Sequence, residues 1–295
     1  KGPLSSLLYK RSVSLRGVYW DAAIQAGVSH PLTGVGYDAF GDWYRRTRSL
    51  KAATWFPGPE TITNVAHNYY LDIFAYGGFP LLLSYLSFTA IGIVSVIRIL
   101  KHLKSYDHIA VVLISSFVAF QAQAIISIPQ IGLAVWGWAI IGMLYSYSRI
   151  LSPKVGDSKT TKIEFNNNDM PIGVLIFVGL AIGFVVAIPP YSADAKWTSA
   201  LNSQDLNKLE SALVPSYFSP SNSDRLANAS LILQNNNLSE KAHKYALQAT
   251  EFNHNNFNGW KALYYIKNST SEERQLALQN MKRLDPLNKN VEQLK

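Results

Sequence analysis

The sequence predicts an all-α protein: a polytopic membrane helix bundle with a large external loop and a C-terminal helical-repeat domain. Its 295 residues are 48% hydrophobic and 16% charged, which resembles an ordinary soluble protein. The apolar residues, however, gather in four long runs with almost no charge in their interiors, whereas residues 191–295 are polar with a helical period. These two patterns predict membrane helices followed by a helical domain outside the membrane.

Four apolar runs define the predicted membrane region. They are residues 79–100, 109–128, 131–147 and 172–188. Each run is 17 to 22 residues long, close to the roughly 20 residues that cross a bilayer core as a helix. The sequence therefore predicts an external loop over residues 1–78, four transmembrane helices within residues 79–190, and an external tail over residues 191–295.

The predicted orientation follows from basic residues in the short connections. Arg98, Lys101 and Lys104 follow the first run, and Arg149, Lys154, Lys159 and Lys162 follow the third. Cytoplasmic connections are rich in Lys and Arg, so both connections are predicted to lie in the cytoplasm. The loop and the tail then lie on the external side.

The external loop opens with a predicted helix over residues 13–26, a stretch without proline. Arg16 lies in the first turn of this helix. Residues 30–37 read His-Pro-Leu-Thr-Gly-Val-Gly-Tyr. We expect a tight re-entrant turn there, because proline fixes its φ and glycine permits backbone angles that other residues avoid.

The rest of the loop leads into the first span. Residues 38–65 are mixed and include Trp-Phe-Pro-Gly-Pro, so we expect a surface or lid loop rather than a long helix. The pattern over His67–Tyr76 predicts a short helix that ends at Gly77-Gly78. Pro80 then starts the span, since proline is tolerated in the first turn of a helix.

Prolines also mark two later boundaries. Ser127-Ile128-Pro129-Gln130 is so short that the second and third spans are expected to form a tight antiparallel hairpin. Pro189-Pro190 is predicted to stop the fourth span, because proline lacks the N–H that a helix interior needs.

The tail contains a weak internal repeat. Ala246-Leu247-Gln248 recurs as Ala277-Leu278-Gln279, 31 residues later, and each copy is followed by an Asn-rich or Pro-containing break. The pattern resembles tetratricopeptide repeats, whose usual period is about 34 residues. An unrelated helical tail remains the alternative.

Composition excludes several classes of site. The chain has no cysteine, so it forms no disulfide and no thiol metal site, and its net charge of +8 is spread too evenly for a nucleic-acid-binding arm. It contains no Walker loop, no Gly-x-Ser-x-Gly and no His-Glu-x-x-His. Gly34-x-Gly36 alone indicates a turn rather than a phosphate cradle.

The remaining motifs occur in a characteristic order. They are Arg16-x3-Trp20, then His30 to Phe40, then Ala66-His67-Asn68-Tyr69-Tyr70-Leu71, and then Gly77-Gly78 before an apolar span. In this order, over roughly residues 12–150, the chain resembles the O-antigen ligase and polymerase family of bacterial envelope glycosyltransferases. The resemblance implies a multi-pass protein of the bacterial cytoplasmic (inner) membrane with its loop outside.

The resemblance also implies a reaction. A glycan would move from an undecaprenyl diphosphate carrier to an acceptor hydroxyl on a glycan, lipid or protein, with no metal or other cofactor. Such a transfer requires neutralisation of the charge that develops on the leaving diphosphate and removal of the acceptor proton. Arg16 fits the first role because a guanidinium stays charged and offers a planar fork to phosphate oxygens.

His67 fits the second role, because an imidazole accepts a proton near neutral pH and the family carries its histidine before asparagine. It would act as the general base, or else hydrogen-bond the sugar or diphosphate. Asn68 could orient a sugar hydroxyl or cap the following helix. The basic residues Arg45, Arg46, Arg48 and Lys51 could attract the anionic carrier, or form a solvated turn. His30 is interpreted as structural.

Alternatives remain at the level of the whole chain. The spans could anchor a non-enzymatic scaffold whose helical-repeat tail binds a protein partner, whereas transport is disfavoured because the span interiors lack ionisable residues. The chain opens with Lys1-Gly2-Pro3, and the family has ten or more spans and a second loop arginine. We therefore expect a fragment that is inactive by itself.

Overall fold

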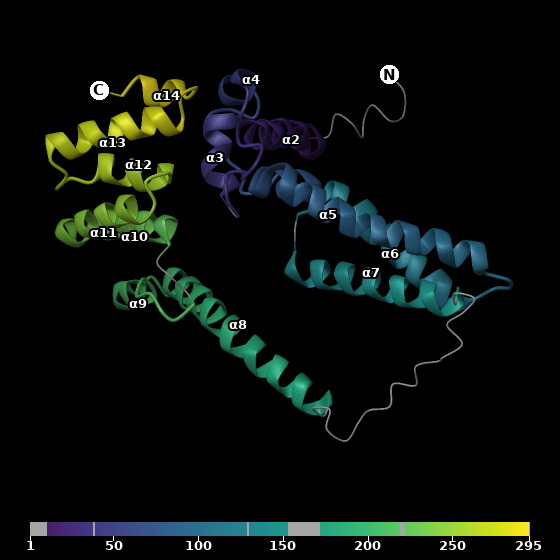
Figure 1. The fold of residues 1–295 in the computed structure, drawn as a ribbon. Helices are drawn as coiled ribbons and strands as arrows, with labels where there is room; N and C mark the ends of the chain where they lie inside the picture. Colours follow the sequence, from purple (N-terminus) through teal and green to yellow (C-terminus); the bar gives the residue numbers. More distant parts are fainter. Residues whose placement is uncertain (1–10, 38, 129, 153–171, 219–221, 295) are drawn as a thin grey trace. The chain divides into compact units, whose positions relative to one another are not determined.

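The structure is a computed structural model that describes residues 11–37, 39–128, 130–152, 172–218 and 222–294. Every regular element in these residues is a helix, which confirms the all-α fold. The chain divides into two compact units, Lys1–Thr160 with Leu287–Asn290 and Thr161–Pro286 with Val291–Lys295. Each unit is described by itself (Figure 1).

The described part of residues 1–78, which are predicted to form an external loop, is more helical than expected. Helix α2 (Arg11–Ser29) contains the predicted helix and extends it at both ends. The stretch 38–65, expected to be a loop, holds the short helices α3 (Phe40–Thr47) and α4 (Leu50–Thr54). Local signals explain them: α3 has Asp42 in its first turn, and the Ser49 hydroxyl accepts a hydrogen bond at the start of α4.

Helix α5 (Tyr69–His102) carries both the predicted short helix and the first predicted span. Its path breaks at Gly78, where φ is +63° and ψ is −158°, so two helical segments meet at a kink. The predicted break at Gly77-Gly78 is therefore confirmed. The small residues of α2 and the outer segment of α5 share a core that includes Ala22, Ala26 and Ala75.

Helices α6 (His108–Ile126) and α7 (Ile131–Leu151) complete the described helices of this unit. Both pack against α5 and against each other. Ile99 of α5, Phe117 of α6 and Leu144 of α7 are buried together, and the Asp107 carboxylate caps the start of α6. The apolar content of these helices thus supplies both their mutual packing and an exposed apolar surface.

Three helices in the described part of the chain are long and apolar enough to cross a membrane: Tyr69–His102, His108–Ile126 and Gly173–Ser203. The third predicted span is helical as α7 but is not among these three. Whether α7 crosses the bilayer stays a prediction. The basic residues Lys154, Lys159 and Lys162, and Pro129 of the predicted hairpin, lie outside the described residues.

In the second unit, helix α8 (Ile172–Ser203) corrects one boundary. The prolines at 189 and 190 were expected to stop the fourth span, but α8 continues through both of them. Proline already has a helical φ, so the cost is the loss of two N–H donors, those that would bond the carbonyls of Val185 and Val186. The helix therefore projects beyond its apolar part.

The tail consists of short helices arranged as hairpins. They are α9 (Leu206–Ala212), α10 (Ser223–Asn235), α11 (Ser239–Phe252), α12 (Phe257–Tyr265), α13 (Ser271–Leu284) and α14 (Lys289–Glu292). Helices α10 and α11 pack together, as do α12 and α13. Ala246 of α11 and Ala277 of α13, which are equivalent in the predicted repeat, are both fully buried.

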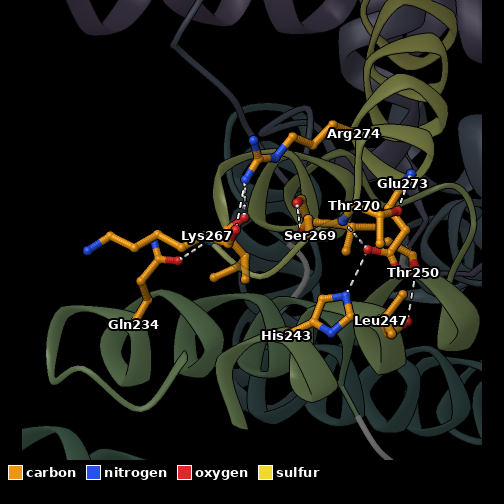
Figure 2. Close-up of polar contacts among 11 residues, drawn as sticks. Gln234, His243, Leu247, Thr250, Lys267, Ser269, Thr270, Glu273 and Arg274 are labelled. Carbon is orange, nitrogen blue, oxygen red and sulfur yellow. Dashed lines mark hydrogen bonds and ion pairs between the residues drawn. The ribbon is translucent and has the colours of Figure 1, made fainter. Parts of the chain in front are cut away.

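Polar bonds link successive hairpins at a nearly constant sequence separation. Lys241 bonds Glu210, 31 residues away, at 2.6 Å, and His243 bonds Glu273, 30 residues away, at 2.9 Å. Figure 2 shows the second contact together with the bond from the Lys267 N–H to Gln234, 33 residues away. This regularity supports a helical repeat; its identification as tetratricopeptide stays a prediction.

Candidate active site

His67 lies in the loop immediately before α5, in a backbone conformation that side-chain-bearing residues seldom adopt. Its φ is +58°, in the left-handed region. On one side the Ala66 N–H donates to Asp72 Oδ1 at 2.7 Å, and the Asp72 side chain is fully buried. On the other side the imidazole stacks on Tyr19 of α2, with ring centroids 5.8 Å apart. Contacts on both sides therefore hold the histidine.

Arg16 lies close enough to His67 to affect its charge. Burial is the larger cause that lowers the pKa of His67 below 6.5, and the positive charge of Arg16 lowers it further. The imidazole is therefore neutral at neutral pH and can accept a proton. The structure thus brings together the two residues that the sequence assigned to catalysis, from α2 and from the start of α5.

Asn68 is the N-cap residue of α5. Its Oδ1 accepts hydrogen bonds from the N–H groups of Tyr70 and Leu71, both at 3.1 Å, and only 8% of the residue is exposed. Of its two predicted roles, the helix cap is the one that its contacts display. The cap fixes the direction in which the chain leaves His67.

Two residues of the predicted basic cluster are buried, and the other two lie over tryptophan rings. Arg48 is 2% exposed, and its Nη1 donates to the carbonyl oxygen of Pro59 at 3.0 Å and to those of Gly58 and Thr61 at 3.4 Å. The buried Arg45 donates to the same Pro59 carbonyl. These two guanidinium groups thus fasten the segment that follows α4.

The other two members lie over aromatic rings. The guanidinium of Arg46 is 4.4 Å from the Trp43 ring, and the Lys51 ammonium is 4.9 Å from the Trp55 ring. Such contacts stabilise a cation without removing its charge. A contact of any of the four with an anionic carrier stays a prediction. His30 packs edge-on against Trp43, with ring centroids 4.5 Å apart.

The re-entrant turn is hydrogen-bonded into the kink of α5. The N–H groups of Val35 and Gly36 donate to the carbonyls of Ala75 and Tyr76, at 2.8 and 3.1 Å. These carbonyls are available because Pro80 has no N–H and the N–H of Phe79 donates to Pro31 instead, at 2.8 Å. The turn thereby supplies the donors that the broken helix lacks.

Two glycines permit this close approach. Gly34 has φ +62°, and a Cβ there would lie 2.3 Å from the backbone at Tyr76 and Gly77. Gly78 has φ +63°, and a Cβ there would lie 2.3 Å from the Pro31 carbonyl oxygen. The Gly34-x-Gly36 motif is thus a turn element, as expected, and it joins the predicted external loop to α5, the first candidate membrane helix.

A cavity of about 480 Å³ lies between α5 and α7, beside the re-entrant turn. Its volume is in the usual range for a small-molecule site. Most of its wall is aromatic, from Tyr37, Tyr69, Tyr76, Tyr85, Phe88 and Trp138. Neither this cavity nor the contacts of Tyr19 and Asp72 were predicted from the sequence. The tyrosines that recur in the N-terminal half of α5 are the feature of the sequence that could have indicated the cavity.

Comparison with known proteins gives one match. Residues 9–86 match the family model described as O-antigen ligase, a segment that contains Arg16, the re-entrant turn, His67-Asn68 and the kink. Searches of curated proteins and of solved structures found no match. The matched segment coincides with the elements that build the candidate site and excludes the tail. Over residues 9–86, about a quarter of its length, the chain is therefore similar to the O-antigen ligase family.

Proposed function

We propose that this chain carries catalytic residues of a membrane glycosyltransferase that transfers or polymerises a glycan from an undecaprenyl diphosphate-linked donor. The acceptor is a hydroxyl group on a glycan, a lipid or a protein. The family supports a glycosyltransferase of the O-antigen ligase type in a bacterial inner membrane. The identity of the donor and of the acceptor goes beyond the family match and belongs to this proposal.

The proposed step is a substitution at the anomeric carbon. The acceptor oxygen forms a bond to that carbon while the bond from the carbon to the diphosphate oxygen breaks, and the electron pair leaves with the diphosphate. His67 takes the proton of the acceptor hydroxyl. Arg16 stabilises the charge that develops on the diphosphate, through hydrogen bonds from its guanidinium fork.

The observation that carries this proposal is the pairing of a neutral imidazole with a guanidinium. Burial and the charge of Arg16 keep His67 unprotonated at neutral pH, so the base is ready while its neighbour stays cationic. A surface ion pair of Arg16 with a carboxylate would not require a histidine beside it. The neutral base and the cationic guanidinium also suit the two ends of the reaction, proton removal and anion stabilisation.

The test is glycan transfer by the full-length enzyme in membranes, with a lipid diphosphate-linked donor. We expect His67→Ala and Arg16→Ala each to lower the transfer rate roughly a hundredfold or more. Arg16→Lys should retain part of the rate, because a lysine keeps the charge but loses the fork. Arg98→Ala and His108→Ala, which change exposed residues elsewhere, are matched controls.

Two results would overturn the proposal. One is transfer that persists unchanged in both the Arg16→Ala and the His67→Ala enzyme. The other is a cellular function that tolerates both substitutions but is lost on deletion of residues 195–295. The second result would instead support a scaffold that acts through its helical tail.

A further inference from the structure

The loop between α9 and α10 exposes a cluster of large apolar side chains. Val214 is 69% exposed, Tyr217 is 75% exposed and Phe218 is 49% exposed. The rings of Tyr217 and Phe218 lie against each other, with centroids 4.2 Å apart. Single exposed apolar residues are ordinary, but a contiguous apolar cluster indicates an interaction surface.

The chain on both sides of this loop is fastened to α8. Before the loop, α9 packs against α8, and Leu209, Ala212 and Leu213 share a core with Ala200. After the loop, Arg225 of α10 forms a 2.8 Å ion pair with Asp194, and its guanidinium lies 5.8 Å from the Trp197 ring. The loop is therefore held beside the part of α8 that follows its apolar segment.

This position is close to the predicted membrane surface. The apolar part of α8 ends at Ile188, and the contact residues Asp194, Trp197 and Ala200 lie about 9 to 18 Å further along the helix axis. The headgroup layer on each side of a bilayer is about 5 to 8 Å thick, and a tilted helix brings its flanking residues closer to it. The contact at Asp194, the nearest of the three, thus brings the chain that follows the loop toward the headgroups of the bilayer that α8 is predicted to cross.

The side chains suit that environment. Tyrosine combines an apolar ring with a polar hydroxyl, and tyrosine and tryptophan are enriched where membrane and water meet. Tyr191, 77% exposed, and Trp197 lie on the same stretch of α8. From Gly173 to Val186 the surface of α8 is exposed and apolar, as expected of a helix that faces lipid.

We propose that Val214, Tyr217 and Phe218 insert into the headgroup region of the bilayer that α8 crosses. The loop then acts as a second contact with the membrane beside the transmembrane helix, and it fixes the orientation of the helical tail relative to the lipid surface. This proposal does not depend on the glycosyltransferase activity.

The absence of cysteine in this sequence allows a clean test. The chain with Tyr217→Cys carries an environment-sensitive fluorophore on that cysteine and is reconstituted into vesicles of phosphatidylcholine and phosphatidylglycerol. We expect blue-shifted emission, quenching by spin-labelled lipid and protection from iodide in the water. Tyr265→Cys is the matched control, since Tyr265 is an aromatic residue of the same tail, 48% exposed in α12. Its label should be quenched by iodide and not by lipid.

A second variant checks that insertion depends on the apolar cluster. Phe218→Asp added to Tyr217→Cys should reduce lipid quenching, because a carboxylate resists transfer toward the bilayer. The proposal is overturned if the labels at positions 217 and 265 show equal iodide quenching and no lipid quenching. It is also overturned if the label at 217 is protected from both quenchers, which would indicate a protein contact.

Discussion

At the scale of single residues, the candidate site depends on how His67 is held. A left-handed backbone at a residue with a side chain is unfavourable and persists only where its surroundings fix it. Here the Asp72 carboxylate holds the preceding amide, Asn68 caps the following helix, and Tyr19 lies against the ring. These contacts fix the backbone on both sides of His67 and place its ring against Tyr19, an arrangement that suits the general base proposed above.

The electrostatic coupling of Arg16 and His67 predicts a pH effect. The pKa of His67 is lowered first by burial and then by Arg16, so removal of the charge raises it part of the way back. Because the base acts only when unprotonated, the residual activity of Arg16→Gln should fall off at a higher pH on the acid side. The measurement is the acid limb of the pH–rate profile, or a carbon-13 titration of the histidine ring.

Arg16→Lys provides the control for this prediction. It keeps a positive charge, so the acid limb should stay close to that of the native enzyme although the rate falls. A limb that does not move in Arg16→Gln would show that the two side chains are not coupled.

Sequence alone could predict the residues whose chemistry is in their type. Arg16 and His67 stand in a recognisable order, and Asn68 carried two possible roles because the same amide can bind a sugar or cap a helix. Tyr19 and Asp72 could not be predicted, since their importance comes from contacts across the folded loop. The burial of Arg48 could not be predicted either, because nothing in the sequence distinguishes it from the three other basic residues nearby.

At the scale of elements, the re-entrant turn and the kink in α5 depend on each other for their backbone hydrogen bonds. The turn supplies two N–H donors and one carbonyl acceptor, and the kink supplies two carbonyl acceptors and one N–H donor. Since a buried unpaired backbone group costs about 1 to 3 kcal/mol, neither element is stable in this form without the other. The coupling fixes the re-entrant turn, and with it the predicted external loop that carries His67, to the first candidate membrane helix.

Substitution of Gly78 should disrupt the contact between the turn and the kink. Gly78→Ala places a Cβ 2.3 Å from the Pro31 carbonyl oxygen at a φ of +63°. The left-handed conformation alone costs roughly 1 to 2 kcal/mol for a residue with a side chain, and the overlap adds to it. We expect a lower thermal unfolding midpoint and reduced transfer activity, measured on purified full-length protein in nanodiscs.

Gly17→Ala is the matched control, because a Cβ on Gly17 of α2 meets nothing within 4 Å. It should leave stability unchanged or raise it by about 0.5 to 1 kcal/mol, as alanine favours a helix. Equal effects of the two substitutions would argue against the turn–kink coupling.

In the tail, the start of α13 is fixed by a reciprocal capping box. The Glu273 N–H donates to Thr270 Oγ1 at 3.1 Å, and the Thr270 N–H donates to Glu273 Oε2 at 2.7 Å (Figure 2). His243 of α11 contacts the same carboxylate. Loss of an N-cap side chain costs about 1 kcal/mol, so Thr270→Ala should speed amide exchange at the start of α13 about five-fold.

Hydrogen–deuterium exchange of the intact chain measures this effect. Ser271→Ala, which changes an exposed neighbour without touching the box, should leave the exchange rates unchanged. The same rates in both variants would show that the box does not stabilise the helix.

The elements predicted best were those with clear local signals. The helix at 13–26 and the break at Gly77-Gly78 are confirmed, because the first stretch contains no proline and the second is a pair of glycines. The short helices within 38–65 were not predicted. They are eight and five residues long, which is too short for a helical pattern of apolar residues to be recognised. Pro189-Pro190 misled because a proline weakens a helix without preventing it when the flanking residues favour one.

At the scale of the whole molecule, function depends on which side of the membrane each segment occupies. A lipid diphosphate donor on the outer leaflet can reach Arg16 and His67 only if the loop that carries them is external. The distribution of basic residues predicts this, because Arg98, Lys101 and Lys104 follow the apolar part of α5 and mark its cytoplasmic end. The helical tail, beyond α8, is predicted on the same side as the loop.

Single cysteines in this cysteine-free sequence test the predicted sides. Leu50→Cys in the loop and Tyr265→Cys in the tail should react with a membrane-impermeant maleimide in intact spheroplasts. Tyr106→Cys, 80% exposed between α5 and α6, should react only after permeabilisation. The unsubstituted chain is the control for background labelling. Reaction of Tyr106→Cys in intact cells would contradict the orientation, and with it the access of an outer-leaflet donor to His67.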